Sequence, residues 1–445
     1  MPSADVAVIG AGLAGLLTAV RLAERGARVV VLAEGNGALH WAGGPIDLGF
    51  RPGARNAGAA VGHLARRRGH PYALLGAEVA PAVDWFVRLT TELGLPHAGS
   101  LDGGFGPLPT GIGGIRPVSV VPEAQVPALL PWAPGERLVV TGHAGYKDFW
   151  PRAVASSLAR PEVWGGFARP ERVIGIAVEW PGLRERRNLN ALRIAEQFDD
   201  PDWRAATLDV TARAVASAGS GPLRVGLPAV LGLRDHARVL AEATQRLGAP
   251  LLELPLVPPG IPGIRLHDAL RAKLRALGGR ILIGERVARV ETTKTKVTAV
   301  ATEAATRELV TRVGALVLAT GGVAGSGLVG DPNGSIRETV LGLPADGPPI
   351  ERWLHGDPLD PASLPIAAAG VRTDDALRPV HPQRPGEGPL FDNVRVVGSL
   401  LAGQHWMVDR SGDGVALASA WRAAASLESR RAQTGRPSRR AEAVR

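Results

Sequence analysis

The sequence of 445 residues predicts an α/β protein with a discontinuous main domain and a second α/β domain inserted into it. Three observations lead to this fold class. The N-terminus shows a complete β-α-β pattern, two later apolar strands end in glycine near residues 320 and 400, and the stretch 95–255 alternates strand and helix patterns of its own. Apolar residues make up 45% of the chain, which suffices for a core in each domain.

The β-α-β pattern occupies residues 5–34. An apolar strand, a helix with apolar residues at mostly helical spacing, and a second apolar strand follow one another. Gly10, Gly12 and Gly15 form a G-x-G-x-x-G turn between the first strand and the helix. In this motif the glycines allow a tight turn, the approach of a pyrophosphate to the backbone, and close packing of the helix on the sheet.

Glu34 ends the second strand, near the position where an acid accepts a hydrogen bond from a ribose hydroxyl. Because the glycine turn stands between two strands and an acid follows at this spacing, we predict a Rossmann-like FAD/NAD(P)-binding domain. A purely structural glycine turn is the alternative. The glycine-dense loop from Gly35 onward contains His40 and suits close approach to a flat flavin ring.

Two later segments are expected to return to the same site. One apolar strand ends in Ala319-Thr320-Gly321, and another ends in Gly398-Ser399 before a small-residue helix that opens at Gly412. Glycine lets the backbone pass close to a nucleotide, and a helix N-terminus can face an anionic flavin edge or a ribitol. The expected cofactor-binding residues are Gly10, Gly12, Leu13, Ala14, Gly15, Glu34, Gly35, His40, Ala319, Thr320, Gly321, Gly398, Ser399, Gly412, Gly414 and Val415.

The expected division of the chain follows from these returns. Three parts form the flavin-binding domain, one part is the inserted α/β domain, one is a cap or substrate segment, and the last is a basic tail that we expect to be disordered. Their bounds are 1–94, 256–330 and 386–428 for the flavin-binding parts, 95–255 for the insertion, 331–385 for the cap segment and 429–445 for the tail.

Composition excludes several kinds of site. The 445 residues include no cysteine, so they hold no disulfide, no thiolate-ligated iron–sulfur cluster and no cysteine nucleophile. No metal site is expected. The formal net charge is +9, and residues 421–445 supply five of it with seven Arg against two Glu. A solvated tail is the simplest interpretation, and contact with lipid, nucleic acid or an acidic subunit is the alternative. We expect no nucleic-acid partner for the chain.

No apolar run reaches the roughly 20 residues that a membrane-spanning helix needs, and no signal peptide is visible. We therefore expect a cytoplasmic location. Peripheral attachment to the inner face of the cell membrane through a partner subunit is compatible with it.

Over nearly its whole length the sequence resembles the B subunits of anaerobic glycerol-3-phosphate dehydrogenases, which belong to the fumarate-reductase-like flavoproteins. Several of the matching stretches are not generic nucleotide-site sequences. They are GAGLAGLLTAVRLAERG (10–26), ALHWAGGPIDL (38–48), HPYALLG (70–76), GHAGYKDF (142–149), PPGIPGIRL (258–266), LATGGVAGSGLV (318–329), NGSIRETVLGL (333–343), GVRTDDALRP (370–379) and VRVVGSLLAG (394–403).

The resemblance implies a complex of three parts. A catalytic A subunit oxidises sn-glycerol 3-phosphate to dihydroxyacetone phosphate, the B subunit carries a flavin, and an iron–sulfur C subunit passes electrons to membrane quinone. The lack of cysteine fits this division. The family flavin is usually described as FMN, but Glu34 stands where the family pattern has a basic residue. Because an acid there favours the adenosine ribose, we rank FAD first and FMN second.

Alcohol oxidation at a flavin needs a base near the carbinol proton and cations for the phosphate. The candidate bases are His40, His267 and His405, and the candidate anion-binding residues are Arg265, Arg337 and Arg378. Each of these histidines has a structural role as its alternative, and Arg337 has a structural salt bridge.

If the A subunit holds the chemistry, this chain needs no base and relays electrons. A stand-alone fumarate-reductase-like or hydroxyacid-oxidising flavoenzyme is a second hypothesis. A flavin-bearing scaffold subunit without turnover is a third.

Overall fold

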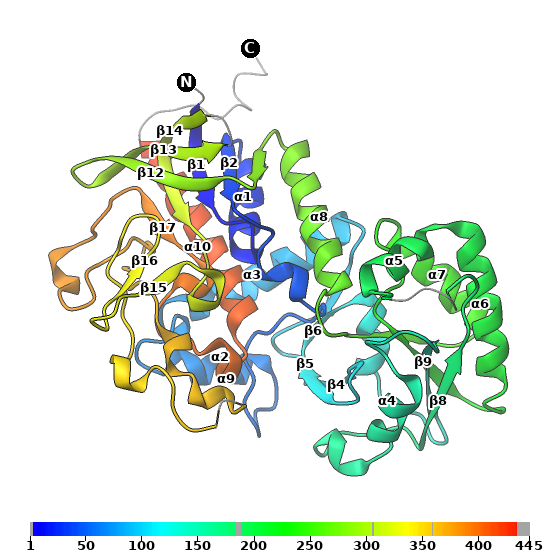
Figure 1. Ribbon diagram of the computed structural model, residues 1–445. Coiled ribbons are helices and arrows are strands. Elements are labelled where there is room, and N and C mark those ends of the chain that lie inside the picture. Colours follow the sequence, from blue (N-terminus) through cyan, green and yellow to red (C-terminus); the bar gives the residue numbers. More distant parts are fainter. Residues whose placement is uncertain (1–2, 184–187, 305–306, 358, 434–445) are drawn as a thin grey trace. The chain divides into compact units, whose positions relative to one another are not determined.

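The computed structural model describes residues 3–183, 188–304, 307–357 and 359–433 (Figure 1). The chain divides into two compact units. The first contains residues 1–38, 47–86 and 267–445, and the second contains 39–46 and 87–266. The second unit therefore overlaps the expected insertion at 95–255, but it also takes in a short segment before it and the residues up to 266.

The first unit is built on a seven-stranded mixed sheet in the order β11-β2-β1-β14-β13-β12, with β17 paired to β14. The strands β11, β2, β1, β14 and β17 run parallel, whereas β13 and β12 join antiparallel beyond β14. The strands are β1 Ser3–Ile9, β2 Val29–Ala33, β11 Arg280–Ile283, β12 Arg286–Thr293, β13 Lys296–Ala304, β14 Arg307–Leu318 and β17 Val394–Val396.

This sheet confirms the predicted fold class, since its strand β1 and helix α1 (Leu13–Glu24) are the first part of the β-α-β unit. β1 lies in the middle of the sheet between β2 and β14, and its residues from Val6 onward are buried. The strand expected to end in Ala319-Thr320-Gly321 is longer than the apolar run before that turn, because β14 continues without interruption from its antiparallel pairing with β13 into the A-T-G turn.

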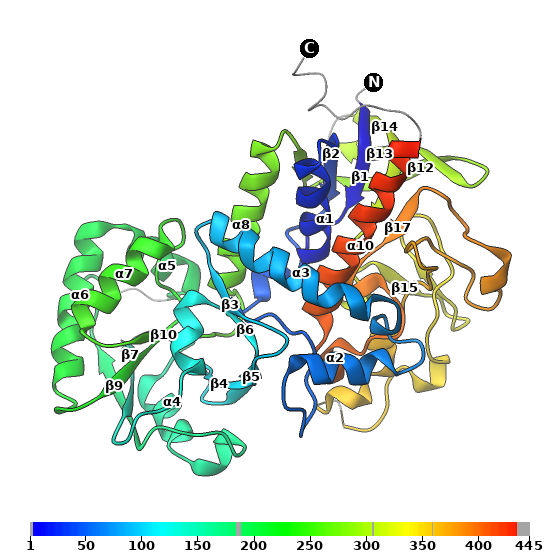
Figure 2. The same ribbon diagram turned by 180° about the vertical axis from the view of Figure 1, so that it is seen from behind.

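Helices α1 and α10 (Gly412–Gln433) pack side by side on the sheet, as both views show (Figures 1 and 2). The guanidinium of the buried Arg21 lies 3.2 Å from the ring centre of Trp421 and 5.2 Å from that of Trp85, which ties α1 to α10 and to α3. α10 reaches Gln433, so residues 429–433 of the expected tail are helical, and the rest of it lies outside the described residues.

The remaining elements of the first unit are short or irregular. Residues 323–401 contain the three short strands β15, β16 and β17, several 3-10 turns and isolated bridges, and they include the expected cap segment 331–385. The elements are α2 Ala57–Ala65, α3 Tyr72–Glu92, β15 Leu328–Gly330, β16 Ile336–Glu338 and α9 Trp406–Asp409, and α3 continues into the second unit.

The second unit has its own parallel four-stranded sheet in the order β10-β9-β7-β8. The apolar side chains of this sheet and of its helices form one buried core cluster. Two small antiparallel pairs, β3 with β6 and β4 with β5, adjoin it in sequence. The elements are β3 His97–Gly99, β4 Gly106–Pro109, β5 Ile115–Val118, β6 Val120–Pro122, β7 Arg137–His143, α4 Pro151–Leu158, β8 Arg172–Val178, α5 Ala191–Asp199, α6 Pro201–Ala216, β9 Leu223–Pro228, α7 His236–Leu247, β10 Leu251–Leu254 and α8 Ile261–Ala276, the last of which ends in the first unit.

Candidate flavin site

The first glycine turn is shaped by contacts that leave no room for side chains. Gly10 has φ +111°, and a Cβ on it would lie 2.2 Å from the carbonyl oxygen of Ala319. A Cβ on Gly15 would lie 2.1 Å from the oxygen of Gly10. Gly10 therefore allows β1 to meet the end of β14, and Gly15 allows α1 to pack against the turn.

Gly12 has the opposite surroundings, because nothing lies within 4 Å of the position of its Cβ. Gly12 is the N-cap of α1 and brings no side chain to the first amides of the helix, those of Leu13 and Ala14. The space beside these amides is thus open on the Gly12 side. A helix N-terminus with free amides is a site for a phosphate group.

The loop after β2 approaches this turn from the other side. Gly37 has φ +70°, and a Cβ on it would lie 2.8 Å from the Cα of Gly12. Sequence reasoning did not single out Gly37, although the glycine-dense composition of the loop was the signal. Glu34 is 72% exposed at the end of β2, and its carboxylate lies 3.6 Å from the similarly exposed Arg286. This exposed ion pair contributes little to stability, so the carboxylate can exchange it for a ligand hydroxyl.

The A-T-G turn lies directly against the first turn. The amide of Ala319 donates to Ile9 O at 2.8 Å. Gly321 has φ +83°, and the buried Oγ1 of Thr320 has no hydrogen-bond partner among the described residues. A buried hydroxyl without a partner is a site where a ligand donor or acceptor fits.

The third turn completes the arrangement. Gly398 has φ +68°, and a Cβ on it would lie 2.8 Å from the Cβ of Ala14. The carbonyl oxygen of Ser399 lies 2.8 Å from the Cβ position of Gly322, and the Ser399 residue itself is exposed. Three glycine turns that are about 300 and 80 residues apart in sequence thus meet at the carboxyl ends of parallel strands, where α/β sheets bind their ligands.

The start of α10 contributes less than the sequence indicated. The amide of Gly414 donates to Asp47 O at 2.9 Å, and the amide of Val415 donates to Ser411 O at 2.9 Å. These two amides are already used, so they do not serve a flavin. The missing Cβ of Gly414 instead makes room for the Tyr72 hydroxyl, which lies 2.0 Å from that position. Gly412 stands at the first position of the helix.

Two of the candidate arginines in the first unit form local ion pairs. Arg337 pairs with Asp331 at 3.2 Å, and Arg378 pairs with Asp374 at 2.7 Å. Glu338 does not pair with Arg337. Its buried carboxylate accepts hydrogen bonds from the amides of Val340 and Leu341 at 2.8 and 2.7 Å, and burial raises the pKa of Glu338.

In the second unit, Arg265 is buried and pairs with the buried Glu253 at 2.8 Å. The pKa of Glu253 is lowered, because the pairing with Arg265 outweighs the effect of burial. The His40 carbonyl accepts a hydrogen bond from the amide of Gly260 at 2.8 Å, within the same unit. These contacts give Arg265 and the His40 backbone structural roles.

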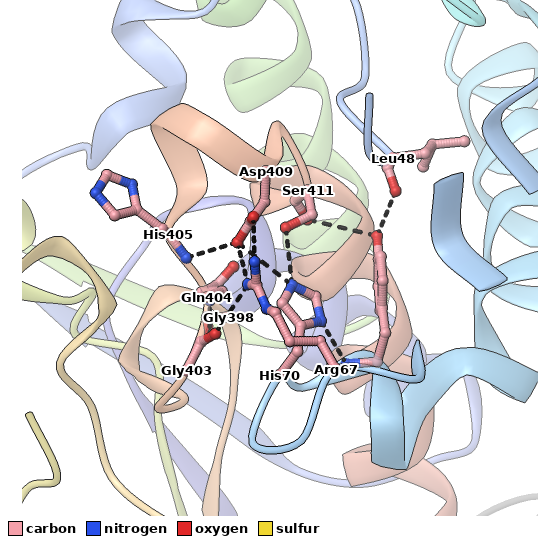
Figure 3. A network of polar contacts seen from close by, with 10 residues as sticks. Leu48, Arg67, His70, Gly398, Gly403, Gln404, His405, Asp409 and Ser411 are labelled. Carbon is pink, nitrogen blue, oxygen red and sulfur yellow. Dashed lines mark hydrogen bonds and ion pairs between the residues drawn. The ribbon is translucent and has the colours of Figure 1, made fainter. Parts of the chain in front are cut away.

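The histidines of the first unit differ in their surroundings. His267 is fully buried in α8, with Nδ1 3.3 Å from Asp268 Oδ1. His405 lies between the third turn and α10, and both its ring nitrogens are buried with no partner among the residues that the structure describes. Figure 3 shows the His405 ring directed away from the polar network that holds its backbone. We therefore single out His405 among the three candidate bases, because neither of its ring nitrogens has a hydrogen-bond partner in the described residues.

The chain belongs to the FAD binding domain family, whose model matches residues 5–415. The open space at Gly12, the approach of Gly37 to it and the unpaired Oγ1 of Thr320 fit this cofactor. The protein is therefore an FAD-binding flavoprotein of the oxidoreductase class. FAD is the cofactor that Glu34 favoured in the sequence.

Curated relatives narrow the class. The B subunit of the anaerobic glycerol-3-phosphate dehydrogenase of Yersinia pseudotuberculosis serotype I is 30% identical over 437 residues, which is 94% of this chain and 96% of the relative. The corresponding B subunit of Pectobacterium carotovorum subsp. carotovorum is 31% identical over 94% of this chain and 96% of its own. That of Vibrio cholerae serotype O1 is 29% identical over 97% and 98%. These similarities confirm the resemblance that the sequence motifs indicated.

Similar solved structures include 3-ketosteroid Δ1-dehydrogenase from Sterolibacterium denitrificans, with 10% identity and a TM-score of 0.46 over 97% of this chain and all of that one. E. coli quinol fumarate reductase FrdA has 12% identity and a TM-score of 0.40 over 98% of this chain and 72% of that one. Among the residues that the structure describes, no helix combines the length and apolar character needed to span a bilayer.

Proposed function

We propose that this chain is the flavoprotein subunit of a complex that oxidises glycerol 3-phosphate to dihydroxyacetone phosphate. The observation that carries the proposal is similarity over 94% of this chain and 96% of a relative named as the B subunit of an anaerobic glycerol-3-phosphate dehydrogenase. The name of that relative also points to a multi-subunit complex. A catalytic A subunit and an iron–sulfur C subunit are the proposed partners, and attachment to the membrane occurs through a partner.

The absence of cysteine from the sequence supports this division of labour. Electrons that leave the flavin one at a time need a one-electron acceptor, and a thiolate-ligated cluster must then reside in another chain. FAD supplies the two-electron redox chemistry when it is bound. The residues of this chain bind the pyrophosphate at the amides of Leu13 and Ala14, the ribose at Glu34, and the flavin end beside Thr320, Gly321 and Gly398.

Substrate oxidation on this chain would need a base, and His405 is the residue we assign to it. Its two buried ring nitrogens are unused within the described part of the chain, so one can accept the carbinol proton while the other holds the proton of the neutral ring. Arg337 is half-exposed and pairs with Asp331. Arg378 is partly buried and pairs with Asp374 at 2.7 Å and with Asp392 at 3.9 Å. A phosphate can therefore recruit either arginine only if that arginine gives up an aspartate partner.

The test separates catalysis from electron relay. The purified chain, loaded with FAD, is mixed with glycerol 3-phosphate, and the bleaching of the flavin absorbance is followed with and without an A subunit from a relative. Bleaching by the chain alone, slowed about 10²- to 10⁴-fold in His405→Gln, supports oxidation on this chain. Bleaching only with the A subunit present supports relay within the same complex. Failure to bleach in both mixtures, or bleaching by a dicarboxylate instead, contradicts the proposed substrate.

His381→Gln is the matched control for this variant. His381 is another histidine of the first unit, and its Nδ1 accepts a hydrogen bond from the amide of Gln383 at 3.3 Å in an exposed turn. The control should bleach at the wild-type rate.

A further inference from the structure

The side chain of Gln404 has a defined orientation and one unused end. Gln404 is 1% exposed, and its Nε2 donates to Gly398 O at 3.1 Å. Since a carbonyl oxygen cannot donate, this contact requires the nitrogen of the amide on the Gly398 side. The Oε1 therefore faces the other way, and it has no hydrogen-bond partner among the described residues.

The residue to which Gln404 donates belongs to the group of glycine turns at the flavin site. Gly398, which accepts the hydrogen bond from Gln404, packs against Ala14 of the first glycine turn. The next residue, Ser399, lies against Gly322 beside the A-T-G turn. Within this group of turns, Thr320 Oγ1 and Gln404 Oε1 are both buried and both unpaired in the described part of the chain. Such groups are uncommon in folded proteins unless a ligand or water fills them.

Asp409 holds the loop that presents Gln404. Its carboxylate accepts a hydrogen bond from the amide of His405 at 2.8 Å, and its own amide donates to His405 O at 2.8 Å. The guanidinium of Arg67 binds the same carboxylate through both terminal nitrogens, with Nη1 2.7 Å from Oδ1. Figure 3 shows the Asp409 carboxylate between the Arg67 side chain and the backbone of His405.

The segment 67–70 contacts the loop 403–411 at two further points. Arg67 Nη2 donates to Gly403 O at 3.2 Å, and a Cβ on Gly403 would lie 1.9 Å from Gly69 O. His70 Nδ1 accepts from the amide of Tyr72 at 3.0 Å, so the ring proton is on Nε2, which lies 3.3 Å from Ser411 Oγ. Residues 403 and 411 at the two ends of the loop are thus held by one short segment.

We propose that Gln404 Oε1 accepts a hydrogen bond from bound FAD and that Asp409 is the positioning residue that holds it there through the loop backbone. An amide oxygen requires a donor, and the flavin end of FAD offers a ring N–H and ribityl hydroxyls. Asp409 does not itself touch the cofactor. The inference rests on FAD binding and is independent of the substrate proposed above.

The first experiment measures FAD affinity of the apoprotein by the quenching of flavin fluorescence. Gln404→Leu removes the acceptor and keeps most of the volume, so the Kd for FAD should rise about tenfold and the visible flavin spectrum should shift. Thr302→Val is the control, because Thr302 Oγ1 is another buried oxygen of the same unit that has no partner among the described residues. Thr302 pairs with Leu309, about 30 Å along β14 from Ala319. The control should bind FAD as the wild type does. A Kd of Gln404→Leu within twofold of wild type overturns the proposal.

The second experiment tests the positioning role by a double-mutant cycle. Asp409→Asn alone should also weaken FAD binding about tenfold, but by less than about threefold in a Gln404→Leu background, since the group it positions is then absent. Arg67→Met, which leaves the Asp409 side chain in place, should behave in the same way, and it replaces Asp409→Asn if that variant does not fold by circular dichroism. If the fold changes in the Kd for FAD of the two single variants simply multiply in the double variant, Asp409 does not act through Gln404.

Discussion

The hydroxyl oxygen of Tyr72 lies 2.0 Å from the position that a Cβ on Gly414 would occupy. The same hydroxyl donates to Leu48 O at 2.8 Å. Tyr72 begins α3 and Gly414 lies in the first turn of α10, so this contact joins two helices that are more than 300 residues apart in sequence. Gly414 is therefore a packing position, whereas the sequence indicated a flavin contact.

Gly414→Ala should destabilise the protein by about 1–3 kcal/mol, because the new methyl group overlaps the Tyr72 hydroxyl. The free energy of unfolding in urea measures the effect. Tyr72→Phe removes the hydroxyl, so the double variant should cost less than the sum of the two single ones. Gly386→Ala is the control, since nothing lies within 4 Å of that Cβ position and the residue is exposed. Equal effects of Gly414→Ala and Gly386→Ala would be incompatible with the overlap.

Glu34→Gln should weaken the binding of FAD about tenfold or more and leave the binding of FMN unchanged. The carboxylate is expected to accept from the ribose of the adenosine half, which FMN lacks, and a hydrogen bond to a charged group contributes roughly 1.5–3 kcal/mol. Titration of the apoprotein with each flavin distinguishes the two.

Glu308→Gln removes the same charge from an exposed pair with Arg289 in the same unit and is the matched control. Parallel losses for both flavins would assign Glu34 to general electrostatics and not to the ribose.

His70 should make stability depend on pH in the acid range. Burial, reinforced by Arg67 and opposed by Asp409, lowers the pKa of His70 to about 4 from its ordinary 6.5. Between these values the unfolded chain binds more protons than the folded one. The contribution of His70 to the free energy of unfolding is therefore complete above pH 6.5. It is lost as the pH falls towards 4, and the total loss is roughly 3 kcal/mol.

The measurement is the free energy of urea unfolding at pH 4 to 7, compared with that of His70→Gln. The free energy of unfolding of the variant should fall less steeply as the pH decreases. The difference between the two slopes should correspond to at most one bound proton. His97, whose pKa burial also lowers to about 4, remains in both proteins and contributes equally to each. Identical slopes for the two proteins would show that His70 is not held neutral.

Arg265→Met should destabilise the protein by about 3–5 kcal/mol, because it leaves the Glu253 carboxylate buried without its cation. Arg337→Met is the control, since the exposed pair with Asp331 should contribute less than about 1 kcal/mol. Both are measured by urea unfolding without substrate. If Arg265→Met folded as stably as the wild type and lost only phosphate binding, the anion-binding role expected from the sequence would stand instead.

Much of the fold could be predicted from local patterns. The glycine turn at Gly10, the strands on either side of it and the A-T-G turn are recognisable because apolar periodicity and the absence of a Cβ are properties of short segments. The end of the strand before Gly398 was harder to predict from the sequence. The strand expected to end in Gly398-Ser399 has only Val394–Val396 in the sheet and is followed by a 3-10 turn at Gly398–Leu400, since Gly398 takes a positive φ.

The candidate arginines and histidines could not be sorted from the sequence. Their types are equally consistent with catalysis and with ion pairing, and the partner that decides between these roles is often distant in the chain. Arg265 pairs with Glu253 within the second unit, while Arg337 pairs with Asp331 and not with the adjacent Glu338.

The amino-acid sequence by itself determined the fold class, the family and the preference for FAD, because these rest on short glycine turns and on one acid at a fixed spacing. Only the tertiary structure decided which polar atoms are free to meet the flavin. The physical reason is that a hydrogen bond depends on what lies within about 3 Å. Arg67 and Asp409, which hold Gln404 in place, are 342 residues apart in the chain.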